Sequence, residues 1–257
     1  MPTLKDKIVF ITGASSGIGE ACAIACAIEG AALILVARRL EKLEALAHTL
    51  SHQYAVRVQI MPLDVSDSKA INKAFAALPP EWKKIDVLIN NAGLALGRES
   101  LAQTPMEDCD TVIDTNIKGV IYSTKAVLPG MITRNQGHIV NIGSIAGHET
   151  YAGGAVYCAT KHAILGLTNA LKKDLLGTAI RVTLISPGVV KTEFNEVRFK
   201  GDHEKAEKVY ANMAPLTAND IAESIIFCLT RPAHVNVSEI IILPTDQASI
   251  SEVHRKS

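Results

Sequence analysis

Short apolar stretches alternate with amphipathic stretches along the whole chain. The apolar stretches are rich in isoleucine, valine and leucine, which is typical of strands buried on both faces of a sheet. The pattern predicts seven strands, at Ile8–Thr12, Ala32–Val36, Val56–Ile60, Val87–Asn90, His138–Ile142, Arg181–Ile185 and Glu239–Leu243. Apolar residues at helical spacing predict helices between them, near residues 17–29, 39–51, 67–77, 105–133, 155–176 and 217–230.

This alternation of strands and helices predicts parallel strands joined by right-handed crossovers. The chain has 257 residues and shows no internal repeat, low-complexity tract or linker, and its length suits a single α/β domain. We therefore expect one α/β domain over residues 1–257. It should hold a doubly wound parallel sheet of about seven strands with helices on both faces.

One polar and charged segment interrupts the alternation, between Pro187 and Pro215. It follows the C-terminal end of a predicted strand, and ligands bind at that edge in open α/β sheets. A long insertion at such a place is more typical of a lid than of a passive loop. We expect residues of about 188–215 to cover a substrate.

The charge balance and the cysteine pattern exclude several classes of protein. Lys and Arg together number 26, as do Asp and Glu, so nucleic acid is not an expected partner. No apolar run is long enough for a membrane span, and the N-terminal MPTLKDK lacks the apolar core of a secretory signal. The five cysteines and eight histidines show neither a disulfide framework nor a metal-ligand spacing. We expect a cytoplasmic protein with no metal and no membrane partner.

A glycine-rich turn, GASSGIG at 13–19, lies between the first predicted strand and the helix that follows it. Gly13 allows the sharp turn, Gly17 lets the backbone approach a pyrophosphate, and Gly19 lets the helix pack closely on the sheet. The N–H groups at the helix start would bind phosphates together with the hydroxyls of Ser15 and Ser16. This placement favours a dinucleotide site over a turn that binds nothing.

The end of the second predicted strand indicates which dinucleotide is bound. An NAD site places an acidic residue there for the ribose 2′-hydroxyl, but this chain has Arg38 and Arg39. Guanidinium groups match a 2′-phosphate through charge-assisted hydrogen bonds, so we expect NADP(H). The alternative is that both arginines begin a solvent-exposed helix. Asp64 and Val65 follow the third strand and are placed to contact the adenine.

Tyr157 and Lys161 are four residues apart at the start of a predicted helix, so they share a face. A cation nearby favours the phenolate of a tyrosine, and Tyr157 would then act as general acid in reduction and as base in oxidation. Ser144 follows a strand at the ligand edge and would hydrogen-bond the substrate oxygen. Asn116 lies within a long helical pattern, where asparagine is a mediocre helix former. It is either a tolerated polar residue or the holder of a proton-relay water.

These motifs occur in an order that resembles the short-chain dehydrogenase/reductase family. They are TGASSGIG at 12–19, NNAG at 90–93, Asn116, Ser144, the Tyr157/Lys161 pair and Pro187-Gly188. The resemblance covers essentially the whole chain. It implies a Rossmann-type sheet, catalysis by an Asn-Ser-Tyr-Lys set and frequently a homotetramer. It also places Asn91 against the cofactor, and Pro187 and the residues that follow it over the nicotinamide.

The expected cofactor-binding residues come partly from the motifs themselves and partly from the family resemblance. They are Gly13, Ser15, Ser16, Gly17, Ile18, Gly19, Arg38, Arg39, Asp64, Val65, Asn91, Tyr157, Lys161, Pro187, Gly188, Val190 and Thr192.

A narrower resemblance is to the NADP-dependent 3-hydroxy acid dehydrogenases, also described as L-allo-threonine or serine dehydrogenases and malonic semialdehyde reductases. It rests on NNAGLALG (90–97), AVLPGM (126–131), YAGG (151–154), TEFNEVRFKGD (192–202), KAEKVY (205–210) and PAHVN (232–236). It implies oxidation of the β-hydroxyl of a small acid such as L-allo-threonine, serine or 3-hydroxypropionate, or the reverse reduction. The match is weaker at the C-terminal tail and around residues 148–150.

A small hydroxy acid needs a cation for its carboxylate. Arg198 lies in the predicted lid and would bind that carboxylate through paired hydrogen bonds. The alternative is a surface arginine whose stem packs on Phe199. Ser144 and Tyr157 complete the expected substrate-binding set, and Gly153 and Gly154 would leave room beside Tyr157.

Two other functions stay open. The same motifs would serve an NADPH-dependent carbonyl reductase of another substrate class, such as 3-oxoacyl thioesters or a sugar ketone. A non-catalytic NADP(H)-binding sensor is the other alternative, but the presence of both Tyr157 and Lys161 disfavours it. In a homotetramer, the long helices at 105–133 and 155–176 would form a four-helix subunit contact.

Overall fold

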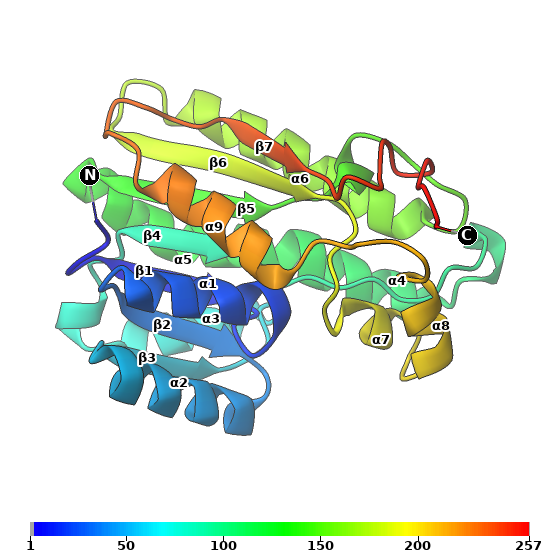
Figure 1. The fold of residues 1–257 in the computed structure, drawn as a ribbon. Coiled ribbons are helices and arrows are strands. Elements are labelled where there is room, and N and C mark those ends of the chain that lie inside the picture. Colours follow the sequence, from blue (N-terminus) through cyan, green and yellow to red (C-terminus); the bar gives the residue numbers. More distant parts are fainter. Residues whose placement is uncertain (1–2, 257) are drawn as a thin grey trace.

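A computed structural model of the protein describes residues 3–256, so Met1, Pro2 and Ser257 lie outside the description. It contains one parallel sheet of seven strands in the order β3-β2-β1-β4-β5-β6-β7 (Figure 1). The strands are β1 Ile8–Thr12, β2 Ala32–Ala37, β3 Val58–Pro62, β4 Val87–Asn90, β5 Gly137–Ile142, β6 Ile180–Pro187 and β7 Glu239–Ile242. The predicted seven-stranded doubly wound sheet is therefore confirmed.

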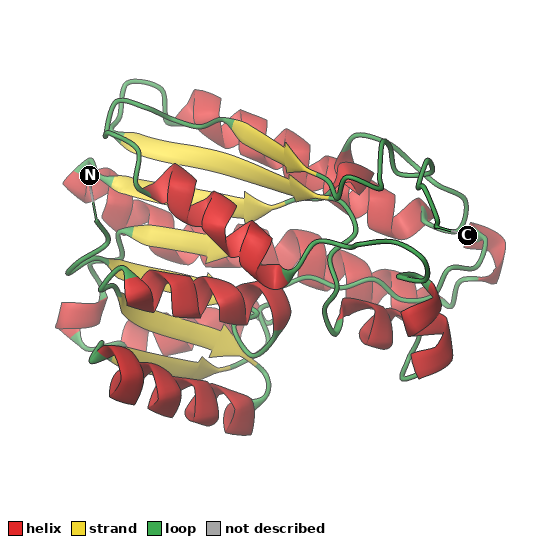
Figure 2. Ribbon diagram, in the orientation of Figure 1, coloured by secondary structure: helices red, strands yellow, loops and turns green. Residues whose placement is uncertain are grey.

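Helices cover both faces of this sheet (Figure 2). They are α1 Gly17–Ile28, α2 Leu40–Tyr54, α3 Ser68–Ala77, α4 Met106–Ile113, α5 Gly119–Arg134, α6 Ala155–Asp174, α7 Phe194–Arg198, α8 His203–Lys208 and α9 Ala218–Leu229. Short helical turns occur at η1 Pro80–Trp82, η2 Leu101–Gln103, η3 Asp114–Lys118 and η4 Ile145–Gly147.

Successive residues of the central strands point to opposite faces and build two separate cores. Val9, Ile11 and Leu33 belong to the core beneath α1, α2 and α9. Phe10 and Ile34 belong to the core beneath α3, α5 and α6. Because both faces are covered, the central strands β1 and β2 are apolar at nearly every position and do not alternate with polar residues. This is the reason that their positions can be predicted from sequence.

Two elements differ from the sequence prediction. Strand β3 begins two residues later than expected, because α2 continues to Tyr54 and Ala55 then adopts a left-handed C-cap with φ 54°. The helix predicted over 105–133 contains a π turn, η3, between α4 and α5. Such turns occur frequently at functional sites, and this one carries Asn116.

The strand order reverses between β1 and β4, so the turns that follow these two strands open a crevice at the carboxyl edge of the sheet. The predicted lid lies at this edge and contains the two short helices α7 and α8, to the lower right in Figure 1. Within residues 3–256, no helix combines the length and apolarity needed to cross a bilayer. In the same part of the chain, no three His, Cys, Asp or Glu side chains form a metal-binding group.

His138 on β5 is a buried titratable group outside the crevice. Its Nε2 lies 2.8 Å from the Thr183 hydroxyl, which itself donates to the Val237 carbonyl. Nε2 must therefore donate, and the buried Nδ1 has no hydrogen-bond partner among the residues that the structure describes. Burial, assisted by Arg181, lowers the pKa of His138 to about 3. Folding thus favours the neutral imidazole.

We expect this histidine to make the protein less stable in acid. The unfolded chain takes up the proton near the ordinary pKa of about 6.5, so the stability is fully present above that pH and is lost as the pH falls toward 3. The loss at pH 5 should be about 2 kcal/mol. Urea unfolding of His138→Gln at pH 7.5 and pH 5 should show a smaller difference between the two conditions. The exposed His234→Gln variant is the control, and an equal change in both variants would contradict the argument.

Candidate active site

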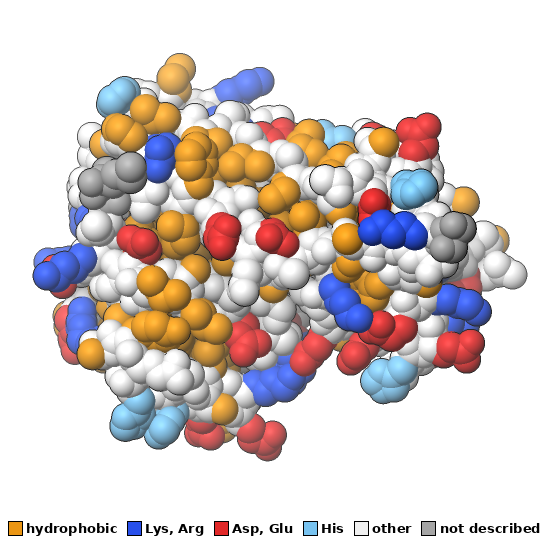
Figure 3. All heavy atoms as spheres, viewed as in Figure 1, with side chains coloured by type: hydrophobic (Ala, Val, Ile, Leu, Met, Phe, Trp, Pro, Cys, Tyr) orange, Lys and Arg blue, Asp and Glu red, His pale blue; other side chains and the backbone are white. Residues whose placement is uncertain are grey.

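A cavity of about 350 Å³ opens at the carboxyl edge of the sheet, where the strand order reverses. Most of the residues singled out in the sequence line it: Gly13, Ser15, Ser16, Gly17, Ile18, Arg38, Arg39, Asp64, Val65, Asn91, Ser144, Tyr157, Lys161, Pro187, Gly188, Val190 and Thr192. Gly19, Asn116 and Arg198 were also expected at the site but do not line this cavity. Figure 3 shows acidic and basic side chains around the notch between the sheet and the α7–α8 segment.

The glycine turn is fastened to the neighbouring strand by Asn91. Its Nδ2 donates to the carbonyls of Thr12 and Gly13 at 3.0 and 3.2 Å. Gly13 has φ +66°, which favours glycine, and a Cβ on Gly19 would collide with the Gly13 carbonyl. Gly19 therefore packs against the turn itself, in addition to the general helix–sheet packing expected from the sequence.

The start of α1 is suited to an anion. Ser16 is the N-cap residue, but its side chain makes no capping hydrogen bond. The N–H groups in the first turn of α1 therefore receive no acceptor from Ser16. These groups and the helix dipole favour negative charge at this point. The Ser15 and Ser16 hydroxyls instead accept hydrogen bonds from the Arg39 guanidinium at 2.8–3.3 Å.

The two arginines differ in their surroundings. Arg39 is the N-cap residue of α2 and its guanidinium is bonded to the glycine turn and to Glu193. Arg38 is 66% exposed, and its Nη1 lies 3.7 Å from an Asp64 carboxylate oxygen. Asp64 also accepts from the backbone N–H and hydroxyl of Ser66 at 2.9 and 2.7 Å. Two guanidinium groups thus share one cavity with the phosphate-binding turn, and this donor set fits a dinucleotide with a 2′-phosphate.

Tyr157 and Lys161 lie on the first two turns of α6, where Lys161 is buried and Tyr157 is partly buried. Lys161 Nζ donates to the Ile142 carbonyl at 2.8 Å and lies 5.7 Å from the centre of the Tyr157 ring. Burial lowers the pKa of Lys161 to about 8 and raises the pKa of Tyr157 to about 12. The charged group that opposes this rise is Arg198, assisted by the Ser144 hydroxyl. From the sequence, Lys161 was expected to be the cation that favours the phenolate of Tyr157. In the structure, the positive charge of Arg198 also lowers the pKa of Tyr157.

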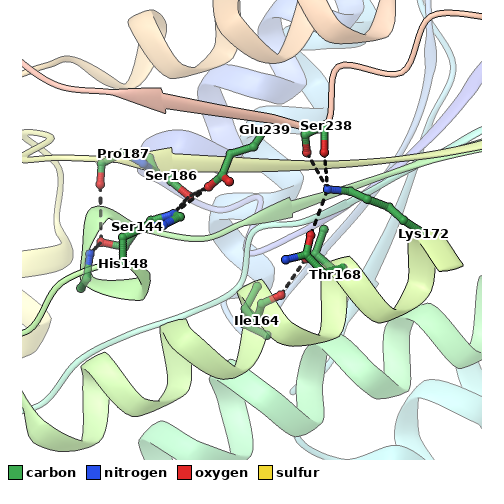
Figure 4. A network of polar contacts seen from close by, with 11 residues as sticks. Ser144, His148, Ile164, Thr168, Lys172, Ser186, Pro187, Ser238 and Glu239 are labelled. Atoms are coloured by element: carbon green, nitrogen blue, oxygen red, sulfur yellow. Dashed lines mark hydrogen bonds and ion pairs between the residues drawn. The ribbon is translucent and has the colours of Figure 1, made fainter.

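Ser144 is held at the end of β5 by a polar network (Figure 4). Its hydroxyl accepts from the Ala146 N–H at 3.1 Å and donates to the Pro187 carbonyl at 3.4 Å. At the other end of the η4 turn, His148 Nε2 lies 2.7 Å from a Glu239 carboxylate oxygen, which also accepts from Ser186 at 2.8 Å. The network fastens the turn that carries Ser144 to strands β6 and β7.

Asn116 is buried in the π turn and is hydrogen-bonded to Leu94 and Thr160. Its Oδ1 accepts from the Leu94 N–H at 2.8 Å, and its Nδ2 donates to the Leu94 carbonyl and the Thr160 hydroxyl at 2.8 and 3.0 Å. A Cβ on Gly93 would lie 3.3 Å from Asn116 Oδ1 and 3.7 Å from Lys161 Nζ. Asn116 therefore holds the chain after β4 close to Lys161, and its role in a proton relay stays a prediction.

Arg198 is buried, so the alternative of a surface arginine is wrong. Its guanidinium carbon lies 5.2 Å from the centre of the Tyr157 ring and 5.0 Å from that of Phe194. Its Nη2 donates to the Tyr151 hydroxyl at 2.9 Å, whereas its buried Nε has no partner within residues 3–256. Arg198 lines a smaller hollow of about 20 Å³, which Tyr151 and Tyr157 also line. A hollow of that size holds about one water molecule.

Several residues at the site were missed from the sequence. Phe194 and Val197 of α7 line the main cavity, and their spacing of three within a polar segment was a weak helical signal. Tyr151 fills the room expected beside Gly154, because a Cβ on Gly154 would lie 2.5–2.8 Å from its ring. Glu193 and Thr115 also line the cavity. No local pattern in the sequence distinguished either of them.

Known proteins resemble this chain over most of its length. Residues 7–203 match the short chain dehydrogenase family. The NADP-dependent 3-hydroxy acid dehydrogenase of Schizosaccharomyces pombe is 47% identical over 257 residues, covering 100% of this chain and 99% of that protein. The NADP-dependent 3-hydroxy acid dehydrogenase YdfG of Salmonella typhi is 49% identical over 250 residues, covering 96% and 99%. The closed form of serine dehydrogenase complexed with NADP+ has a TM-score of 0.91 at 47% identity, covering 97% of this chain and 100% of that one. The chain therefore belongs to the short chain dehydrogenase family.

Proposed function

We propose that this protein is an NADP-dependent oxidoreductase that transfers a hydride between nicotinamide and the β-hydroxyl or carbonyl of a small 3-hydroxy acid. The observation that carries the proposal is one cavity that holds the glycine turn, Arg38, Arg39 and the Ser144/Tyr157/Lys161 group. Relatives at 47–49% identity are named for this activity. L-allo-threonine, serine and 3-hydroxypropionate with its product malonic semialdehyde are the candidate substrates.

The bound cofactor supplies the carbon that accepts or donates the hydride. Tyr157 takes the hydroxyl proton in oxidation and returns it in reduction. Ser144 donates a hydrogen bond to the reacting oxygen as charge develops on it. Lys161 stays in place through the Ile142 carbonyl, binds the nicotinamide ribose and favours the phenolate by its charge. Asn116 positions the chain beside Lys161 through Leu94.

Arg198 recognises the carboxylate of the substrate in this proposal. A buried guanidinium whose Nε finds no partner within the described part of the chain is a costly arrangement, and an anion would satisfy it. The hollow that Arg198 lines is too small for a hydroxy acid, so α7 must shift as the substrate enters. Residues 188–215 act as the lid that makes this movement.

The assembly and the compartment are further parts of the proposal. Met106 and Ile113 of α4 are exposed by 73% and 37%, and apolar side chains on this helix suit a contact between subunits of a homotetramer. All five cysteines are buried and unpaired, which agrees with the reducing cytoplasm.

The function is tested by the absorbance of reduced nicotinamide with NADP⁺ or NAD⁺ and a panel of small 3-hydroxy acids. We expect NADP⁺ reduction with L-allo-threonine, L-serine or 3-hydroxypropionate, and much weaker reduction of NAD⁺. Turnover with NAD⁺ alone would contradict the role of Arg38 and Arg39. If no hydroxy acid reacts but a 3-oxoacyl thioester is reduced with NADPH, the proposed substrate class is wrong. The proposed hydride transfer between NADP(H) and a carbonyl group then still holds.

Replacing Tyr157 by phenylalanine should lower kcat by about 10²- to 10⁴-fold, because the proton then has no acceptor. Binding of NADPH, followed by its fluorescence, should change little, since the ring is retained. Tyr122→Phe, on α5 and outside the residues that line the cavity, is the control and should keep most of kcat. Equal losses in the two variants would mean that the hydroxyl of Tyr157 has no special part in proton transfer.

Arg198→Lys should raise the KM for the hydroxy acid about tenfold or more, because lysine cannot form paired hydrogen bonds with a carboxylate. The rate of oxidation should increase with pH as Tyr157 loses its proton. In Arg198→Gln this increase should occur at a higher pH. The sign follows from the positive charge of Arg198, which lowers the pKa of Tyr157, so its removal delays formation of the phenolate. An unchanged KM in Arg198→Lys would rule out carboxylate binding.

A further inference from the structure

Glu193 is an acidic residue at a place where an anionic ligand is expected. It lies at the start of the lid, directly before α7, and lines the main cavity. One carboxylate oxygen lies 2.8 Å from Arg39 Nη1 and the other lies 2.6 Å from Lys42 Nζ. Hydrogen bonds from Lys42 and Arg39 lower the pKa of Glu193 to about 2. The carboxylate is therefore ionised at neutral pH and bound between two cations.

Lys42 occupies an unusual position for its charge. It lies in the first turn of α2, which begins at Leu40, where the helix dipole disfavours a cation. Its ammonium group is held there by Glu193, 151 residues away in the sequence. Lys42 and Arg39 thus form a pair of cations on Glu193, and Arg39 is the one of the two that lines the cavity. Their shared anion comes from a distant segment of the chain.

The remaining N–H groups of Arg39 point to the phosphate-binding turn. Its Nε and Nη2 donate to the hydroxyls of Ser15 and Ser16, and its Nη1 donates to Glu193. The carboxylate of Glu193 therefore neutralises the same guanidinium that the proposed function assigns to the 2′-phosphate. A phosphate dianion and a carboxylate on one guanidinium repel each other, so the two anions compete for it.

We propose that Lys42 joins Arg39 as a cation for the 2′-phosphate of NADP(H), and that Glu193 is the internal counter-ion that this phosphate displaces. The inference rests on the proposed preference for NADP(H). It adds one specificity-determining residue, Lys42, and one residue that limits the affinity, Glu193. Each of them acts on the 2′-phosphate alone, because neither contacts the catalytic group.

The test compares NADPH and NADH binding, measured by nicotinamide fluorescence on the full-length protein without substrate. Glu193→Gln removes the competing charge and keeps the shape, so NADPH should bind about three- to tenfold more tightly. Lys42→Met removes a charge-assisted hydrogen bond, so NADPH should bind about tenfold more weakly. NADH affinity should stay the same in both variants. Glu196→Gln, a half-exposed acidic residue of α7 that pairs with His203, should change neither affinity.

Three results would overturn the inference, and they are distinguishable. Weaker NADPH binding in Glu193→Gln would mean that the carboxylate stays on the cations and closes over the bound cofactor. An equal effect of Lys42→Met on NADPH and NADH would mean that Lys42 does not bind the 2′-phosphate. If the unmodified protein binds NADH as tightly as NADPH, the proposed cofactor preference itself fails, and the inference fails with it.

Discussion

The reversal of strand order between β1 and β4 is the constraint on which the site depends. Parallel strands end at one edge of the sheet, and only where the order reverses do the following segments diverge and leave a crevice. Here the glycine turn at 13–19 follows β1 and forms one wall of the crevice, and the segment that begins at Asn91 follows β4 and forms the other. The hydrogen bonds from Asn91 to Thr12 and Gly13 fix the distance between the two walls. The phosphate-binding turn is therefore held in place by the protein's own hydrogen bonds.

Burial then determines the chemistry at the inner end of the crevice. Without other charges, burial keeps Tyr157 protonated and favours the loss of the proton from Lys161. Neither effect suits a base that works near neutral pH. Arg198 partly corrects this by placing a permanent positive charge 5.2 Å from the Tyr157 ring. Because Arg198 comes from α7, the proton affinity of Tyr157 depends on the position of the lid.

The sequence predicted the sheet well, because the central strands are buried on both faces, are mostly apolar and are bounded by polar turns. It did not predict the π turn at Asn116, since one π turn leaves the helical spacing of apolar residues almost unchanged. Helices α7 and α8 have only five and six residues, too few for a periodic signal. Most motif residues of the cavity were predicted because they follow strands, and Tyr157 and Lys161 were predicted because they are four residues apart on one helix. The burial of Arg198 and the Lys42–Glu193 pair were not, since both depend on contacts between segments far apart in the chain.

The lid is attached more firmly at its centre than at its rim. At the rim, Lys191–Glu207 and Lys200–Asp108 are ion pairs with exposed lysines, and such pairs contribute at most about 1 kcal/mol each. At the centre, Arg198 is buried, and its carbonyl accepts a hydrogen bond from the Gly97 N–H at 2.8 Å. The C-terminal tail adds a further contact, where the Gln247 side chain accepts from the Val189 N–H at 2.9 Å. In the proposed function, a substrate carboxylate replaces the Tyr151 hydroxyl as the partner of Arg198 and so removes one of the contacts that hold α7. A neutral alcohol of the same size would leave that contact in place, so the proposal ties the preference for acids to the way in which α7 is held.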